Sequence, residues 1–332
     1  MAGASGKKKT VKYAKPKPKK MAKPKRGQRR NKVLKIKAAS WEAKNFKELG
    51  RGGEAIIYTL KPGIVAKIFL KPDAPEFAED PELREAAWVR IEEMQTKLFS
   101  FPKDLPAELV TPTGVLVNGR NRVFGYVMPF INGTSLDKLG RTNMNPTAKK
   151  TKKMLVSLYD TVVKLHEQGV IIGDFNENNI IVFRDIPYLI DADSMQFGPY
   201  QCRSFIPRFT APEILRITNS DAGSGRKKKD IRQWSFAMAT TYNELTDWYS
   251  YLVIAMRLLT FTDPYGGVAY DMDLAERMSQ RITVFDQPVV YPLIAKPLSS
   301  VPRPILETFF KVFHLHKRFI PDKKIFDSLA NN

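Results

Sequence analysis

One short segment, IIGDFNENNIIVF (Ile171–Phe183), constrains the fold most, because it places a polar loop between two apolar runs. Apolar runs of this length, rich in isoleucine and valine, are typical of short buried strands. Within the loop, Asp174 and Asn179 stand five positions apart. The carboxylate could accept a proton from a hydroxyl group, and the amide oxygen could bind a divalent cation. A plain turn is the alternative explanation, because Asn and Asp also favour turns.

A second acidic loop follows at YLIDADSMQF, where Asp191 comes directly after the apolar run Tyr188–Ile190. Its carboxylate could supply an anionic oxygen that complements the neutral oxygen of Asn179. Magnesium binds few protein oxygens and keeps water and phosphate as its other ligands, so two side chains suffice. The two loops together predict a magnesium site beside the candidate base Asp174.

The segment LGRGGEAIIYTL, followed by GIVAKIF, is typical of two strands joined by a glycine-rich turn. Gly50, Gly52 and Gly53 leave room for backbone N–H groups to approach phosphates. Lys67, on the second strand, would offer a positive charge to the same phosphates. The alternative is an ordinary hairpin whose lysine faces solvent.

Residues 81–99 have the pattern of a helix and carry several carboxylates, one of which could orient Lys67. We favour Glu85, since it shares a helix face with Trp88 and Val89, which we expect to point toward protein. The less favoured carboxylates of this segment are Glu82, Glu92 and Glu93.

The N-terminal segment, residues 1–39, is rich in lysine and proline, and we expect it to be disordered. The whole chain has a formal net charge of +20; residues 1–37 contain 16 Lys and Arg and no acidic residue. We expect this basic tail to contact nucleic acid or another polyanion such as anionic lipid, with a nuclear-targeting signal as a further option. The alternative is a solubilising tail.

Short strands precede long helices along the rest of the chain, which predicts an α+β fold with two lobes. Residues 40–130 would form a small lobe rich in strands, the N-lobe, and residues 131–332 a larger, helical C-lobe. The expected strands are Ala55–Leu60, Ile64–Phe69, Gly114–Val117 and Arg122–Met128, and the expected later helices are Thr151–Gln168, Asp247–Thr260 and Arg303–His316. One cysteine, and no apolar run near the ~20 residues that span a bilayer, favour an intracellular, cytoplasmic protein without a membrane span.

The order of these motifs resembles that of the eukaryotic-like protein kinases, over about 46–265. VAKIF is similar to the lysine strand of that superfamily, KLHEQGVIIGDFNENNIIV to its catalytic loop, TAPEI to its Ala-Pro-Glu segment, and DWYSYLVIAMRLLTFTDPYGG to a later helix. The patterns GDxNxxN and DxDS resemble those of an atypical bacterial and phage kinase-like branch.

The resemblance implies a two-lobed kinase-like fold with a five-stranded N-lobe. It also implies ATP and Mg²⁺ as cofactors and a protein, phosphorylated on Ser or Thr, as the substrate. Lys67 would hold the α- and β-phosphates and be oriented by Glu85. Asp174 would accept the hydroxyl proton, while Asn179 and Asp191 would hold magnesium. The remaining cofactor-binding residues implied are Gly50, Gly52 and Gly53 over the phosphates, and the backbone of Met128 and Phe130 at the adenine.

Several positions depart from the superfamily pattern. Ile172 and Gly173 replace the His-Arg before the base, Asn176 replaces a lysine, and Asp193 follows Ala192 where Phe-Gly is usual. The alternatives are therefore a catalytically weak pseudokinase or nucleotide-binding scaffold, or a nucleic-acid-binding accessory protein. Retention of Lys, Asp, Asn and Asp at the four key positions favours catalysis. A basic insertion at 226–229 would be a solvated surface loop or would steer acidic partners.

Overall fold

A six-stranded sheet lies in the N-terminal part of the computed structural model, which describes residues 34–37, 42–141, 144–220, 233–269 and 272–330. The strand order is β1-β5-β6-β4-β3-β2. The bounds are β1 (Leu34–Lys37), β2 (Lys47–Arg51), β3 (Ala55–Lys61), β4 (Ile64–Phe69), β5 (Gly114–Val117) and β6 (Val123–Pro129). The two predicted strands Ile64–Phe69 and Gly114–Val117 are confirmed residue for residue.

Strand β1 corrects two expectations, the count of five strands and the extent of the disordered tail. Its four residues fall inside the segment 1–39, yet they pair in parallel with β5 at the edge of the sheet. An edge strand tolerates lysines, because only one of its sides must pair and its side chains can reach solvent. The rest of the predicted tail lies outside the described residues.

The antiparallel core of the sheet places Lys67 centrally. Strand β4 lies between β3 and β6, so that Lys67 stands opposite Ile57 on one side and Tyr126 on the other. The turn between β5 and β6 is built at Asn118, whose side-chain oxygen accepts the backbone N–H groups of Arg120 and Arg122 at 2.9 and 3.0 Å. This turn has the sequence NGRN and joins two of the strands that the sequence predicts.

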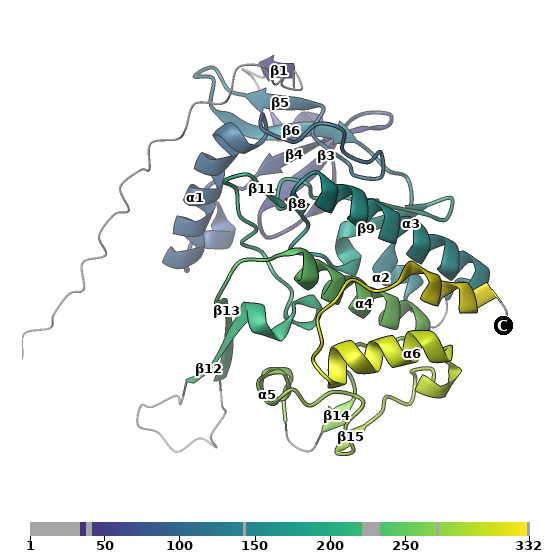
Figure 1. Cartoon of the computed structure of the whole chain (residues 1–332). Coiled ribbons are helices and arrows are strands. Elements are labelled where there is room, and N and C mark those ends of the chain that lie inside the picture. The colour runs from purple at the N-terminus through teal and green to yellow at the C-terminus, as the bar shows by residue number, and fades with distance from the viewer. Residues whose placement is uncertain (1–33, 38–41, 142–143, 221–232, 270–271, 331–332) are drawn as a thin grey trace, which may run out of the picture. The chain divides into compact units, whose positions relative to one another are not determined.

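Helix α1 (Pro81–Lys97) packs beside the sheet (Figure 1). It begins at Pro81 because the Asp80 side chain caps it, accepting the N–H groups of Glu82 and Leu83. Met94 and the following Leu98 join the buried cluster of the sheet. The helix thus closes one side of the strands that carry Lys67.

Helices dominate the remainder of the chain, together with short strand pairs (Figure 1). The helices are α2 (Leu136–Leu139), α3 (Ala148–Glu167), α4 (Glu244–Thr260), α5 (Leu274–Gln280) and α6 (Arg303–Phe309). The strands are β7 (Thr134–Ser135), β8 (Val170–Ile171), β9 (Ile180–Phe183), β10 (Ile186–Leu189), β11 (Gln196–Phe197), β12 (Leu215–Ser220), β13 (Gln233–Met238), β14 (Val268–Ala269) and β15 (Val289–Val290).

Helix α4 is the centre of this helical region, since its residues are buried almost all round. Its core includes Trp248, Tyr251 and Leu252, which are nearly inaccessible to solvent. The segment predicted as one helix over Arg303–His316 instead changes to a π-helical turn at Phe310–His314. In the described part of the chain, no helix combines the length and apolar character needed to cross a membrane.

The predicted basic insertion, residues 226–229, lies outside the described residues. The described segments on either side of it pair with each other as β12 and β13. The described residues belong to one compact unit. Its sheet and its helical region correspond to the mixed α and β architecture predicted from the sequence.

Gly125 offers a test of how closely β4 and β6 must approach. A Cβ atom there would lie 2.4 Å from the backbone oxygen of Lys67, whereas one at Gly119 would meet open space. We expect Gly125→Ala to lower the free energy of unfolding by about 2 kcal/mol, since the strands must separate to accept the methyl group. Gly119→Ala should change it by less than about 0.5 kcal/mol. Urea unfolding of both variants measures this, and equal stabilities would contradict it.

Candidate active site

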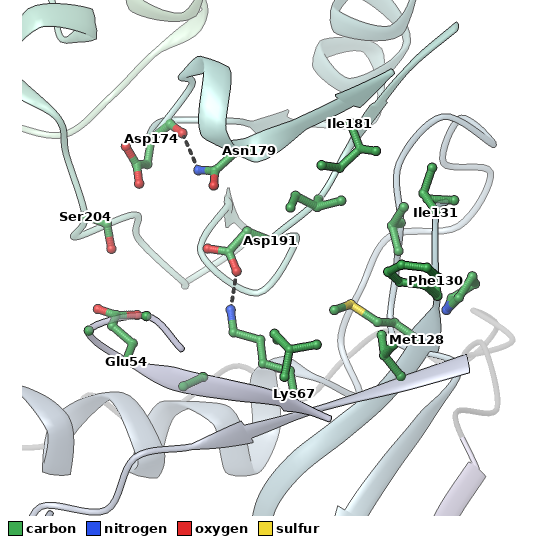
Figure 2. A pocket seen from close by; sticks show the side chains of 18 residues that line it. Glu54, Lys67, Met128, Phe130, Ile131, Asp174, Asn179, Ile181, Asp191 and Ser204 are labelled. Atoms are coloured by element: carbon green, nitrogen blue, oxygen red, sulfur yellow. Dashed lines mark hydrogen bonds and ion pairs between the residues drawn. The ribbon is translucent and has the colours of Figure 1, made fainter. Parts of the chain in front are cut away.

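A cavity of about 500 Å³ opens between the sheet and the loops that follow α3 (Figure 2). This volume lies in the range of pockets that hold small molecules and cofactors. Its polar end is lined by Lys67, Asp174, Asn179 and Asp191, and its apolar end by Val65, Met128, Ile131, Ile181 and Ile190. The structure therefore brings together the four polar residues singled out in the sequence.

Asp174 is held by two neighbouring asparagines. Asn176 donates its amide N–H to the Asp174 carboxylate at 2.9 Å and to its backbone oxygen at 3.0 Å. Asn179 donates to the same backbone oxygen at 3.0 Å (Figure 2). Asn176 is 1% exposed, so its side chain lies in the interior of the protein and bonds Asp174 from there. These bonds hold the Asp174 carboxylate at the cavity. Asn179 uses its side-chain NH₂ group for its bond and not its side-chain oxygen.

Asp247, near the start of α4, anchors the loop from behind. Its fully buried carboxylate accepts the backbone N–H groups of Ile172 and Gly173 at 2.7 and 2.9 Å, and it pairs with His166 at 2.9 Å. Gly173 has φ +74°, and a Cβ atom there would lie 2.7 Å from the Cys202 side chain. A glycine is required at this position because of both the backbone conformation and the packing.

A tight turn presents Asp191 to the cavity. Asp191 has φ +66°, an uncommon conformation for a residue with a side chain. Its carbonyl accepts both the N–H and the hydroxyl group of Ser194, at 3.0 and 2.8 Å. The preceding Ile190 donates its N–H to the carbonyl of Asn179 at 2.9 Å. Asn179 and Asp191, the two candidate magnesium ligands, are thereby tied to each other through the backbone.

Lys67 reaches from β4 to this turn and pairs with two carboxylates. Its amine contacts Asp191 (Figure 2) and lies 2.8 Å from Asp193. The Tyr126 hydroxyl donates to the same Asp193 oxygen at 2.6 Å. Burial alone would lower the pKa of Lys67, but the two carboxylates raise it above its ordinary value, so the amine is charged.

The two carboxylates differ in their electrostatics. Burial raises the pKa of Asp191, and Lys67 opposes this only in part. Burial would also raise the pKa of Asp193, but Lys67, Tyr126 and Lys97 together hold it below its ordinary value. Asp193 is thus the more firmly ionised partner of the lysine.

Burial raises the pKa of Asp174 to about 6. The hydrogen bond from Asn176 opposes this shift, whereas the negative charges of Asp191 and Glu54 reinforce it. A carboxylate with this pKa is largely ionised at neutral pH and is a stronger base than an ordinary aspartate. The Asp174 carboxylate is therefore suited to accept a proton.

The glycine-rich turn covers one side of the cavity. Gly52 donates its N–H to the Ala55 carbonyl at 2.9 Å, which closes the turn between β2 and β3. Gly52 and Gly53 line the cavity, but the predicted Gly50 lies within β2 and does not line it. Met128 and Phe130 both line the apolar end, as expected.

The predicted ion pair between Lys67 and Glu85 is wrong for this structure. Glu85 is exposed and lines a different cavity, and the partners of Lys67 are the aspartates described above. The helix packs through Ala87, Met94 and Leu98. At about 100° per residue, Glu85 lies roughly 200° from Ala87, on the opposite face. Trp88 and Val89, which were expected to face protein, are exposed at 56% and 36%.

The chemistry of these residues fits ATP with magnesium. A carboxylate and an amide oxygen, on loops that are bonded to each other, form the oxygen-only set that a hard cation prefers. The lysine lies beside them, and the branched aliphatic residues Val65, Ile131 and Ile181 offer an apolar slot for a flat base. Asn179 and Asp191 would hold the metal and Lys67 the phosphates.

Three residues of this site were not assigned a role by sequence reasoning. From the sequence, Asn176 is only the replacement of a lysine, yet it fixes Asp174. Asp193 is only a departure from Phe-Gly, and the sequence assigns no role to Tyr126, whose hydroxyl group donates to Asp193. The spacing of Asn176 two residues after Asp174 is a signal that could have been used, because asparagine at that distance often bonds the preceding loop. No sequence signal joins Tyr126 to Asp193, which lie 67 residues apart.

Comparisons with known proteins agree with this site. Residues 107–197, which include Asp174, Asn179 and Asp191, match the RIO domain family. The chain is 26% identical over 258 residues to Protein kinase YegI of Escherichia coli strain K12, covering 72% of this chain and 35% of that protein. It is 28% identical over 190 residues to Protein kinase YegI of Escherichia coli O157:H7, covering 52% of this chain and 27% of that protein.

The chain thus spans well under half the length of these relatives. The RIO match covers the two loops of the site, and the longer alignment extends the similarity over most of the chain. Together with the order of the motifs and the geometry of the cavity, these matches make the chain similar to atypical members of the eukaryotic-like protein kinase superfamily.

Proposed function

We propose that this protein is an ATP- and magnesium-dependent phosphotransferase that acts on serine or threonine hydroxyls of a protein. The observation that carries the proposal is a single cavity lined by Lys67, Asp174, Asn179 and Asp191. These four side chains come from β4 and from two separate loops. Their convergence with an apolar slot matches what transfer of a phosphoryl group from a nucleotide requires.

Each residue has a definite task in this proposal. When bound, ATP and magnesium supply the phosphoryl group and neutralise the charge that develops on it. Asn179 and Asp191 hold the metal, Lys67 binds the phosphates, and the backbone of Gly52 and Gly53 covers them. The backbone groups of Met128 and Phe130 hold the base.

Asp174 orients the acceptor hydroxyl group and takes its proton at a carboxylate oxygen. Its raised pKa supports this role, because the ionised form dominates at neutral pH while the proton affinity exceeds that of an exposed aspartate. Asn176 keeps the carboxylate oriented toward the cavity. A protein acceptor is supported by the relatives from Escherichia coli, whose names describe them as protein kinases.

The first prediction concerns Asp174→Asn. We expect phosphoryl transfer to fall about 100- to 10,000-fold, because the proton acceptor is lost. The affinity for ATP should change less than about threefold, since Asp174 is assigned no contact with the nucleotide. Transfer of labelled phosphate to the protein itself and to lysate measures the first quantity, and binding of a fluorescent ATP analogue measures the second. Phosphoamino-acid analysis of the product then identifies the acceptor.

Asp73→Asn is the matched control, since Asp73 is an exposed carboxylate away from this cavity. It should keep both transfer and binding. Wild-type protein that binds ATP but transfers no phosphate to any acceptor would favour the nucleotide-binding scaffold instead. Unchanged transfer by Asp174→Asn would rule out this residue as the base.

The second prediction concerns pH and stability. Because the pKa of Asp174 rises from 3.8 in the reference state to about 6 in the folded protein, the folded state binds its proton more tightly. The resulting stability is present below about pH 4 and is lost as the pH rises through about 6. Asp174→Asn should therefore be more stable than wild type by about 3 kcal/mol at pH 7.5. The gain should shrink below pH 4, and urea titrations of both proteins at several pH values measure this.

We also propose that the basic N-terminal segment contacts nucleic acid. Residues 1–30 contain 13 Lys and Arg and no acidic residue, so they can release counterions from a phosphate backbone. Deletion of residues 2–30 keeps β1, which belongs to the sheet. We expect this deletion to abolish a salt-sensitive shift of DNA or RNA in gel electrophoresis. Nucleotide binding should stay unchanged, and a shift that survives the deletion would contradict the assignment.

A further inference from the structure

We propose that Asp193, fixed by the Tyr126 hydroxyl group, is the positioning residue that orients Lys67 toward the phosphates of a bound nucleotide. This is the task that the sequence assigns to the helix residue Glu85. The inference rests on the proposed nucleotide-binding function and concerns only how Lys67 is held. It follows from the contacts, the burial and the position of the two aspartates that meet the lysine.

The contacts form a buried chain from the sheet to the turn. Tyr126 stands opposite Lys67 in the β4–β6 register, and its hydroxyl group donates to Asp193 at 2.6 Å. The same Asp193 oxygen accepts from the Lys67 amine at 2.8 Å. Charge-assisted hydrogen bonds of this length orient both partners. Asp193 is therefore held between two neighbouring strands, one of which carries the lysine.

Burial separates the roles of Asp193 and Asp191. The Asp193 side chain is 4% exposed and does not line the nucleotide cavity, whereas the Asp191 side chain is 27% exposed and does. Lys67, at 8%, lies between them. Asp191 can turn from the lysine to a metal ion in the cavity. Asp193 does not line that cavity, so it can keep its contact with the lysine while Asp191 binds a metal ion.

Helix α1 supplies no competing carboxylate at Lys67. Glu82 and Glu85 are exposed, and Glu92 pairs with Arg122 at the β5–β6 turn. Glu93 pairs with Lys97 at 3.6 Å and with Arg203 at 3.2 Å. Asp193 is thus the buried carboxylate that contacts the Lys67 amine without lining the cavity.

The test compares the affinity for ATP with the affinity for adenosine, which lacks the phosphates that Lys67 would bind. Asp193→Asn should weaken ATP binding about tenfold while adenosine binding stays within about twofold. Tyr126→Phe should weaken ATP binding about threefold, since the carboxylate remains but loses its anchor. Lys67→Met sets the maximal loss. Adding Asp193→Asn to Lys67→Met should cause no further loss, because the two residues act as one unit.

Two control variants isolate the effect. Glu85→Gln should leave both affinities unchanged, as should Tyr159→Phe, which removes a tyrosine hydroxyl contact to the Pro321 carbonyl. Circular dichroism establishes that each variant is folded. Tyr126→Phe keeps the test decisive if Asp193→Asn does not fold.

Three results would overturn the inference. They are an equal loss of adenosine and ATP affinity in Asp193→Asn, an unchanged ATP affinity in Asp193→Asn and Tyr126→Phe, and a loss in Glu85→Gln that matches the loss in Asp193→Asn. Wild-type protein that does not bind ATP at all would instead overturn the proposed function. Titration of each ligand, followed by the intrinsic fluorescence of the protein or by calorimetry, gives all of these affinities.

Discussion

The carboxylate of Asp247 is the contact on which the site depends most. It is fully buried and compensates its charge with two backbone N–H groups and His166. Removing it would leave three polar groups without a partner in a protein interior, which is costly. Asp247 lies near the start of the buried helix α4, so its hydrogen bonds attach the loop that carries Asp174 to the helical core. The base is thereby placed by packing that is remote from the cavity.

The Lys67 cluster joins this rigid loop region to the sheet. One turn, from Asp191 to Ser194, supplies both the aspartate that faces the cavity and the aspartate that faces away from it. The orientation of the lysine then depends on β6 and on this turn, and not on the angle of helix α1. A movement of α1 relative to the sheet would leave the Lys67–Asp193 contact intact, since neither partner belongs to the helix. This separates the chain from kinases in which a helix glutamate holds the lysine.

Local signals predicted much of the fold and the polar end of the cavity. The strand Ile64–Phe69 was identifiable because it is a short apolar run bounded by a glycine turn. Asp174, Asn179 and Asp191 were identifiable because they lie in polar loops next to apolar runs. The strand β1 was missed, since its pairing with β5 is a contact between distant segments of the chain. Glu85 was misassigned because the rotation of α1 is set by Met94 and Leu98, and an exposed tryptophan gave the wrong face.

The contacts of Asn176 and Asp193 give these departures from the superfamily pattern a physical explanation. Asn176 removes a positive charge from the loop, but it keeps Asp174 oriented through a partly buried hydrogen bond. The loop geometry is thus preserved although the charge is lost. Because Asn176 is neutral, the positive charge beside Asp191 in the cavity comes from Lys67. A displaced Lys67 amine would therefore weaken phosphate binding directly. Asp193, a second and buried aspartate, limits this displacement because it also binds the amine. This gives a physical reason for the DADS sequence at the place where Phe-Gly is usual.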